Sequence, residues 1–406
     1  MKTIVLFILL FSSFICYSQV GWEIVTSPVT EDFVSVCFAD EQQGWILSDQ
    51  GSLLTTTDGG QTWLTSSLSD GTYTGLCFSD ADHGFAVGYN DSSFILKTDD
   101  GGATWELVDH PKALRLNDVY FNDVDVGWAV GIYDNKNYQL HTVDGGQNWE
   151  PQSSISVLEA ELFSVHFRDS QSGNTCGADG IFFSTNNGGD NWALDVSIPS
   201  LGEELFCVYN WDMFNGCAVG TSGTALVTTN KWGSYTETNT NTEEALMAVT
   251  KSPSSNKLLA VGTNGTILYT QNYLLGWGTQ TSGTSEELTD ILMISDDLGW
   301  AVGKNGTILY YGTGLGMREI KSPYSLAVFP NPTTGPLHCI IRTQIQGNVK
   351  FSVSDLRGRE IALVSENQLP AGTTSCQLEL SFLPDGIYFL RLQTSTGIIT
   401  QKIIKK

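Results

Sequence analysis

Charged residues recur one position ahead of short apolar segments that alternate like β-strands. The seven residues at this position are Asp32, Thr72, Arg115, Glu161, Glu204, Ala245 and Glu287. Further glutamates adjoin them at positions 31, 203, 243, 244 and 286. Carboxylates that gather at one opening could bind a cation or a basic or hydroxyl-rich ligand. Two carboxylates about 5–10 Å apart could instead hydrolyse a glycosidic bond.

The sequence carries no other pattern that predicts a catalytic, cofactor or metal site. No Cys-x-x-Cys pair suits zinc or redox chemistry, and no Gly-x-Gly-x-x-Gly or phosphate loop appears. The histidines at positions 83, 110, 141 and 166 fall at unrelated places in the repeats described below. We therefore predict no catalytic residue, no metal site and no cofactor, and a cation at the acidic residues stays an open alternative.

The elements that must position these charges form a repeating unit. Its clearest copy is Gly-Trp-Ala-Val-Gly at residues 127–131, followed by Asp144-Gly145-Gly146 and Trp149. Alternating large and small residues indicate a strand, and Asp-Gly indicates a tight turn. The first glycine recurs at positions 44, 84, 127, 173, 216 and 299, and the tryptophan at positions 63, 105, 149, 192 and 277.

This spacing of about 43 residues, with four short strands in each unit, is typical of a β-propeller blade. Seven inner strands are expected, and residues 19–315 would form an all-β, seven-bladed propeller. The last blade lacks its outer strand, whereas residues 22–25 match the outer strand at residues 105–108. We therefore predict that the N-terminal strand closes the ring, which removes an exposed sheet edge.

The ring geometry decides what the charged residues can do. Equivalent positions in a propeller converge near its axis, so Asp32, Arg115, Glu161, Glu204 and Glu287 form a candidate axial binding site. The alternative is that they are solvated loop charges. Strands alternate in direction, so the Asp-Gly-Gly turns are expected on the opposite face.

The two ends of the chain differ from the propeller. Residues 1–18 have a charged start, an apolar core and a small residue at position 18, which predicts a secretory signal peptide. Residues 316–323 read as a linker, and residues 324–406 alternate like the strands of a small β-sandwich. Seven cysteines follow the signal, and most lie in apolar strand patterns as small hydrophobic residues; sequence does not assign a disulfide.

The composition limits the classes of partner that this protein is expected to bind. The net charge of −24 is carried by residues 20–320, and such an acidic surface repels a phosphate backbone, so we expect no nucleic-acid binding. No stretch is long and apolar enough to predict a transmembrane segment. We expect a monomer.

The turn Thr56-x-Asp58-x-Gly60-x-Thr62-Trp63 resembles the Asp-box, or bacterial neuraminidase repeat. The turns with Asp100, Asp144 and Asn187 repeat it. The resemblance implies structural turns at the rim and no catalytic role. Over residues 20–315, the full unit resembles the photosystem II stability/assembly factor-like propellers, and this resemblance implies the fold more firmly than a function. The few propeller arginines disfavour a sialidase, which holds a carboxylate with several of them.

The tail resembles the type A sorting domain of type IX secretion. The matching residues are Pro330, Asn331, Pro332, Asp355, Gly358, Arg359, Gly386 and Tyr388. The resemblance implies export across the outer membrane of a Bacteroidota bacterium through the type IX machinery. The alternative is an ordinary accessory sandwich.

Together these inferences predict a secreted or cell-surface propeller that binds or scaffolds a protein or a polysaccharide without catalysis. The alternative function is a carbohydrate-active glycoside hydrolase that uses the axial carboxylates. A third reading is an adhesive module with no specific ligand.

Overall fold

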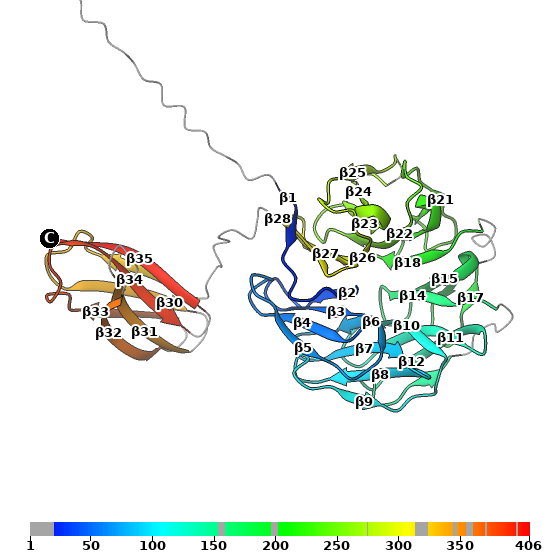
Figure 1. Ribbon diagram of the computed structural model, residues 1–406, viewed down its shortest axis with the longest axis horizontal. Helices are drawn as coiled ribbons and strands as arrows, with labels where there is room; N and C mark the ends of the chain where they lie inside the picture. Colours follow the sequence, from blue (N-terminus) through cyan, green and yellow to red (C-terminus); the bar gives the residue numbers. More distant parts are fainter. Residues whose placement is uncertain are drawn as a thin grey trace, which may run out of the picture. The chain divides into compact units, whose positions relative to one another are not determined.

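The protein is described here from a computed structural model. It describes residues 20–152, 159–195, 202–273, 275–312, 324–343, 347–354, 360–369, 372–394 and 397–406. The chain divides into two compact units, Met1–Leu315 and Gly316–Lys406 (Figure 1). The expected signal peptide, residues 1–18, lies outside the described residues.

The first unit contains seven four-stranded antiparallel sheets among its described residues, numbered here as blades 1 to 7. Blade 1 consists of β2 (Phe33–Phe38), β3 (Gly44–Ser48), β4 (Ser52–Thr56) and β5 (Leu64–Ser67). Blade 2 consists of β6 (Thr72–Phe78), β7 (Gly84–Tyr89), β8 (Ser93–Thr98) and β9 (Glu106–Val108). Blade 3 consists of β10 (Arg115–Phe121), β11 (Gly127–Tyr133), β12 (Lys136–Thr142) and β13 (Glu150–Pro151).

Blades 4 to 6 include short 3-10 turns between their second and third strands. Blade 4 consists of β14 (Leu162–Phe167), β15 (Gly173–Gly177), η1 (Ala178–Gly180), β16 (Phe182–Thr185) and β17 (Ala193–Leu194). Blade 5 consists of β18 (Leu205–Asn210), β19 (Gly216–Gly220), η3 (Thr221–Gly223), β20 (Ala225–Thr228) and β21 (Thr236–Glu237). Blade 6 consists of β22 (Leu246–Lys251), β23 (Leu258–Gly262), η4 (Thr263–Gly265), β24 (Ile267–Thr270) and β25 (Gly278–Gln280).

Blade 7 joins the two ends of this unit. It consists of β26 (Leu288–Ser295), β27 (Leu298–Gly303), β28 (Thr307–Gly312) and the N-terminal strand β1 (Gly21–Val25). Strand β1 pairs with β28 from Gly21↔Gly312 to Val25↔Ile308. Each inner strand also contacts the inner strands of both neighbouring blades, and the contact of β26 with β2 completes the circle (Figure 1). The predicted seven-bladed ring, closed by the N-terminal strand, is confirmed.

Aromatic side chains pack the blades against one another. Trp128 of blade 3 stacks on Phe167 of blade 4, with ring centroids 3.4 Å apart. Trp192, which follows the turn of blade 4, meets the edge of Phe167 at 5.7 Å. The same three-ring pattern recurs at three other blade interfaces, as Trp45–Phe78–Trp105, Phe85–Phe121–Trp149 and Trp300–Phe38–Trp63. Buried aromatic pairs of this kind contribute both area and geometry, which explains why the tryptophans recur in the sequence.

The last glycine of the repeated Gly-Trp-Ala-Val-Gly pattern allows a close backbone approach. A Cβ atom on Gly220 would lie 1.8 Å from the carbonyl oxygen of Glu204, and one on Gly177 would lie 1.9 Å from that of Glu161. The pairing skips one residue just beyond this point, as between Leu205 and Cys207. Such a bulge kinks the strand, and glycine leaves room for it in six of the seven blades, whereas blade 1 has Ser48 at this position. In those six blades the glycine therefore positions the residue at the start of the inner strand, where most of the candidate site residues stand.

The second unit is a sandwich of two antiparallel sheets. One sheet contains β29 (Tyr324–Phe329), β30 (Leu337–Thr343) and β33 (Gly372–Leu378); the other contains β31 (Gly347–Ser354), β32 (Glu360–Leu369), β34 (Gly386–Thr394) and β35 (Gly397–Lys405). Buried residues such as Ile341 from the first sheet and Phe351 and Leu392 from the second share one core. The predicted small sandwich is confirmed, with β29 as a strand that the sequence pattern did not indicate.

The close approach at the last glycine of each repeat can be tested with Gly220→Ala. The added Cβ would overlap the Glu204 carbonyl, so we expect a loss of about 1–3 kcal/mol or more in the free energy of unfolding. Gly233→Ala is the matched control, because its Cβ would meet its nearest neighbour at 3.3 Å. Urea unfolding of both variants measures the difference, and equal stabilities would contradict this account of the repeat.

Candidate functional site

Arg115 and Glu161 bridge two blades beside the axis. The guanidinium Nε and Nη2 of Arg115 in blade 3 both donate hydrogen bonds to the carboxylate that precedes blade 4. Asn117 adds a hydrogen bond from its Nδ2 to Glu161 Oε1 at 2.6 Å. The Glu161 side chain is 11% exposed, whereas Arg115 remains 39% exposed. The hydrogen bonding to Glu161 raises the pKa of Arg115, so the guanidinium stays charged and its direction is fixed.

The other three predicted residues have separate surroundings. Glu287 forms an ion pair with Lys304 of its own blade at 3.0 Å. Asp32 Oδ1 accepts a hydrogen bond from the backbone N–H of Asn305 at 2.9 Å, which links blade 1 to blade 7. The Glu204 side chain is exposed. Among the described residues, no group of three or more His, Cys, Asp and Glu side chains is placed to hold a metal ion.

The second row of glutamates anchors the loops that lead into the inner strands. Glu244 Oε2 accepts hydrogen bonds from Thr263 Oγ1 at 2.6 Å and from Asn264 Nδ2 at 2.8 Å. The hydrogen bond from Thr263 has the larger effect and that from Asn264 the smaller one, and both lower the pKa of Glu244. Equivalent contacts join Glu31 to Ser48, Glu203 to Thr221 and Glu286 to Asn305. These carboxylates thus hold the loop that precedes the inner strand against the turn between the second and third strands of the same blade.

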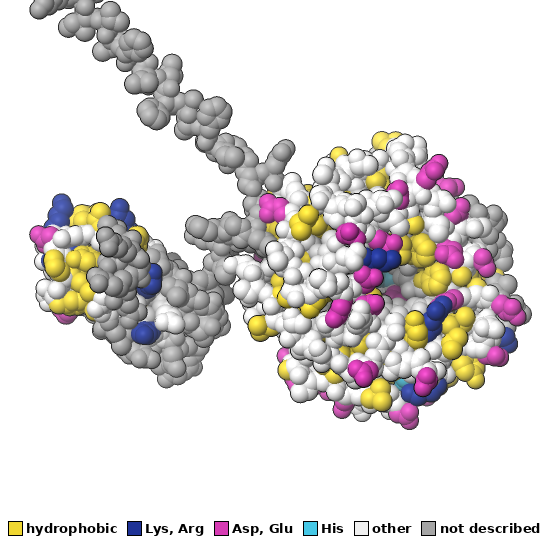
Figure 2. Space-filling view, in the orientation of Figure 1, with side chains coloured by type: hydrophobic (Ala, Val, Ile, Leu, Met, Phe, Trp, Pro, Cys, Tyr) yellow, Lys and Arg dark blue, Asp and Glu magenta, His cyan; other side chains and the backbone are white. Residues whose placement is uncertain are grey.

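Figure 2 shows acidic and basic side chains around a hollow in the middle of the ring. Most of the charged side chains at the candidate site form an ion pair or a hydrogen bond with another residue of the protein. Arg115, Lys304 and Glu204 are still at least partly exposed to solvent. This arrangement could offer fixed donors and acceptors to a polar ligand.

Two carboxylates deeper in the ring were missed by the sequence reasoning. Asp118 Oδ2 accepts a hydrogen bond from the Val165 N–H of the next blade at 2.9 Å. Asp290 Oδ2 does the same for Val36 at 2.8 Å and also accepts from Ser35 Oγ at 3.1 Å. The available signal was a single Asp inside an inner strand, next to the bulge.

Burial dominates the titration of these two groups. It raises the pKa of Asp118 to about 7 and that of Asp290 to about 6, although backbone hydrogen bonds oppose the shift. Both residues are half-buried, and protein surrounds their carboxyl groups. A charge there is poorly solvated, which favours the neutral acid.

Other inner-strand side chains complete this wall. Thr74 and Thr289 each donate to a main-chain oxygen of the next blade, Leu116 and Phe33 respectively, both at 2.7 Å. His166 lies between Tyr120 and Tyr209 with ring centroids 4.7 Å apart on each side. Burial lowers the pKa of His166 to about 3, so its imidazole is neutral at physiological pH.

The opposite face carries the predicted Asp-box turns. Asp58 Oδ1 accepts from Thr56 Oγ1 at 2.8 Å and from the Thr62 N–H at 2.9 Å, and its Oδ2 accepts from Thr62 Oγ1 at 2.6 Å. Corresponding hydrogen bonds surround Asp100, Asp144 and Asn187. The Thr104 hydroxyl lowers the pKa of Asp100. These contacts are all local to the turn.

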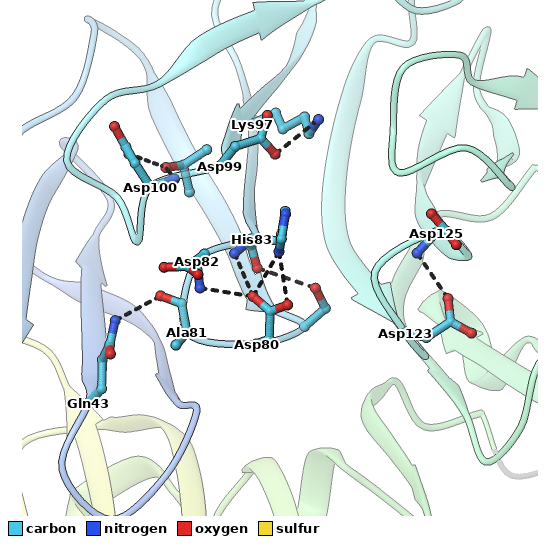
Figure 3. A network of polar contacts seen from close by, with 12 residues as sticks. Gln43, Asp80, Ala81, Asp82, His83, Lys97, Asp99, Asp100, Asp123 and Asp125 are labelled. Carbon is cyan, nitrogen blue, oxygen red and sulfur yellow. Dashed lines mark hydrogen bonds and ion pairs between the residues drawn. The ribbon is translucent and has the colours of Figure 1, made fainter. Parts of the chain in front are cut away.

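A second acidic turn on the same face was not noticed in the sequence. Asp80 Oδ1 accepts the N–H groups of Asp82 and His83, and its carboxylate also contacts His83 Nδ1 at 2.8 Å (Figure 3). Gln43 of the preceding blade reaches the Ala81 carbonyl at 2.7 Å. The same turn recurs around Asp40, Asp123, Asp169 and Asp212. Its signal was an Asp two residues after the inner strand in each of blades 1 to 5.

A cavity of about 540 Å³ also lies on this opposite face, between blades 6 and 7. Its lining residues are Ser255, Asn256, Lys257, Gln271, Asp296, Asp297 and Tyr311. Lys257 Nζ donates to the Tyr311 hydroxyl at 2.7 Å. None of the five predicted axial residues lines this cavity.

Two protein families match the chain. The family described as photosynthesis system II assembly factor YCF48 matches residues 16–74 and 67–198, and the secretion system C-terminal sorting domain matches residues 327–406. The chain is thus similar to the YCF48 propellers over residues 16–198 and carries a secretion-system sorting domain at residues 327–406. The resemblance to the photosystem II stability/assembly factor-like propellers and the resemblance to a secretion sorting domain are confirmed.

Curated relatives match only part of the propeller. The photosystem II assembly lipoprotein Ycf48 of Synechococcus sp. (strain CC9902) is 33% identical over 116 residues, which are 28% of this chain and 33% of the relative. The chloroplastic photosystem II stability/assembly factor HCF136 of Arabidopsis thaliana is 27% identical over 110 residues, 26% of either chain. The chain thus spans about a third of one relative and a quarter of the other.

Solved structures extend the likeness to the whole ring. YCF48 bound to D1 peptide superposes with a TM-score of 0.58 at 19% identity, covering 73% of this chain and 98% of that one. YCF48 from Cyanidioschyzon merolae gives 0.59 at 16% identity, covering 72% and 99%. The WD40 propeller domain of Doa1 gives 0.60 at 12% identity, covering 73% and 98%. At these identities the likeness shows the fold alone.

In the sorting domain, the described motif residues contact the last strand. Asn331 Nδ2 donates to the Lys402 carbonyl at 2.7 Å, and its Oδ1 accepts the Ile404 N–H at 2.9 Å. Tyr388, two residues after Gly386, donates its hydroxyl to the Pro384 carbonyl at 3.0 Å. Asp355, Gly358 and Arg359 lie outside the described residues. Pro330 and Pro332 lie on either side of Asn331, the residue that bonds to the last strand.

The sorting domain indicates export by type IX secretion, to the cell surface or beyond. Among the described residues, no helix has the length and apolar character needed to cross a membrane.

The buried carboxylates predict a specific pH dependence. The folded pKa values of Asp118 and Asp290 exceed the ordinary value of 3.8, so their stabilising effect is present below about pH 4 and is lost as the pH rises through 6 to 7. We expect Asp118→Asn to reduce the loss of stability between pH 5 and 8, by an amount on the order of 1–4 kcal/mol.

Urea unfolding at several pH values measures this slope against wild type. Asp134→Asn is the control, because Asp134 is exposed and asparagine tolerates its positive φ of 48°. The two variants are compared with wild type under the same conditions, since neutral His166 gives the parent protein an opposing slope. Parallel profiles for wild type and Asp118→Asn would show that this carboxyl does not titrate in the folded state over that range.

Proposed function

We propose that the exported propeller is a non-catalytic binding module, and that it holds a protein or polysaccharide segment across the face with the axial opening. The main support is the Arg115–Glu161 pair. The carboxylate is mostly buried and fixes the guanidinium, which keeps 39% of its side chain exposed. A donor oriented in advance in this way loses little freedom when it binds a ligand.

A protein partner fits this surface better than a sugar chain in one respect. Basic Lys304 and Arg115 and acidic Glu204 are at least partly exposed, and such a mixture suits the mixed charges of a peptide. One similar propeller, YCF48, has been solved with a D1 peptide bound. We infer that this chain holds a peptide segment of a surface or secreted protein, and a polysaccharide is the second ligand to be tested.

The contacts of the carboxylates favour binding over hydrolysis. A glycoside hydrolase needs an acid and a second carboxylate free to act on the substrate. Glu161 is held by Arg115 and Asn117, and Asp118 and Asp290 accept backbone hydrogen bonds from the next blade. Their oxygens already serve the fold. The glycoside hydrolase remains the alternative that a turnover assay addresses.

The rest of the proposal concerns the route by which the chain is exported. We propose that residues 1–18 direct the chain out of the cytoplasm and that the sorting domain, joined through residues 316–323, engages the type IX machinery as a monomer. The candidate residues Asp32, Arg115, Glu161, Glu204 and Glu287 would then face ligand outside the cell.

Photo-cross-linking on the cell surface tests the site. A cross-linking residue at exposed position 204 should capture one defined partner, whereas the same residue at position 64, an outer-strand site that is 74% exposed, should not. Binding of that partner to purified protein is then measured by calorimetry. We expect the Glu161→Gln/Glu204→Gln/Glu287→Gln variant to bind at least about tenfold more weakly.

Two results would overturn the proposal. One is unchanged affinity in the triple variant, with circular dichroism showing an intact fold. The other is turnover on a panel of polysaccharides, which would establish the hydrolase instead.

A further inference from the structure

Two cysteines of the sorting domain face each other across neighbouring strands. Cys339 of β30 and Cys376 of β33 are direct partners in the antiparallel register. Directly opposed residues place their side chains on the same face of the sheet, with Cα atoms about 4.5–5.5 Å apart. A disulfide spans Cα separations of about 4.4–6.8 Å. No strand movement is therefore needed to join them.

The side chains already touch. The structure holds both residues as thiols, and the Cys339 thiol hydrogen bonds with the sulfur of Cys376. Cys339 is fully buried in the core of the sandwich, whereas Cys376 is only half-buried. One sulfur is thus protected, and the other can be reached by a reagent from solution.

Described propeller cysteines behave differently. The sulfur of Cys176 lies 3.4 Å from the Leu205 carbonyl oxygen, and those of Cys37 and Cys207 lie 4.0 Å from the Phe78 and Val249 oxygens. These thiols donate to backbone across blade interfaces. The contact between two thiols in the sorting domain is a separate arrangement, and a buried hydrophobic role alone does not require two cysteines in register.

We propose that Cys339 and Cys376 form a disulfide in the sorting domain once the chain reaches an oxidising compartment. The oxidant is a protein disulfide or a small-molecule disulfide such as oxidised glutathione. The Cys376 thiolate attacks one sulfur of the oxidant, which releases one thiolate and leaves a mixed disulfide. The Cys339 thiolate then attacks Cys376 Sγ and expels the second thiolate. The two cysteine protons are released, and the oxidant is reduced to two thiols.

The bond would act on both sheets of the sandwich. It closes the segment from residue 339 to residue 376, which contains β31 and β32 of the facing sheet. A cross-link of this span restricts the unfolded chain and so stabilises the folded domain. In a reducing compartment the two cysteines would stay as thiols and the domain would lack the cross-link. In an oxidising compartment the disulfide would form and stabilise the domain.

Peptide mapping of the full chain tests the proposal directly. The reduced protein is incubated with oxidised glutathione, the remaining thiols are alkylated, and the chain is digested with trypsin without reduction. We expect a linked pair of peptides, residues 322–342 with residues 360–391, lighter by two hydrogens than the sum of the separate peptides. Dithiothreitol should separate them.

Thermal unfolding provides the second readout. Oxidised wild type should show an unfolding transition about 5 °C or more above that of the reduced protein. Cys376→Ser should lose the difference, whereas Cys217→Ser, which removes a buried propeller thiol, should retain it. If glutathione adds to Cys376 without release by Cys339, or if both cysteines stay open to alkylation after oxidation, the proposal is wrong. The mapping uses wild type, so it does not depend on the folding of a variant.

Discussion

The innermost strands of the ring impose the main constraint on this protein. Each has a neighbour on its outer side only, so half of its backbone groups face the axis without a strand to pair with, and a buried unpaired group is costly. Side chains of the preceding blade supply the partners, such as Asp118 for Val165, Asp290 for Val36 and Asn117 for the Leu162 carbonyl. The blades are therefore joined by hydrogen bonds around the axis as well as by packed aromatic rings.

This constraint explains the chemistry of the axial opening. Polar side chains must be present at the inner strands because they complete the neighbouring backbone, and burial then raises the pKa of the two carboxyl groups among them. The charged residues before the inner strands also have structural partners, since Glu244 accepts a hydrogen bond from a turn and Glu161 pairs with Arg115. What remains for a ligand is the exposed part of groups whose direction the fold has already fixed.

The repeats show how far sequence can reach. The spacing of the glycines and tryptophans was enough to obtain seven blades and the closing strand, because most blades repeat the same local requirements. One glycine must admit a carbonyl oxygen, as Gly220 does for Glu204, and one tryptophan must meet the ring of a phenylalanine, as Trp192 meets Phe167. The inward placement of Asp118 and Asp290 was missed because a lone Asp in a strand does not reveal that its partner is the next blade.

The sequence by itself determined the repeat, its period, the closing strand and the type of the C-terminal domain, since these depend on residue patterns within one unit. Only the tertiary structure decided which charges are held and which remain open. Arg115 and Glu161 are 46 residues apart, and Cys339 and Cys376 are brought together only by the pairing of β30 with β33. The physical reason is that a side chain's partner, burial and pKa depend on contacts between blades or strands distant in the chain, which no local pattern records.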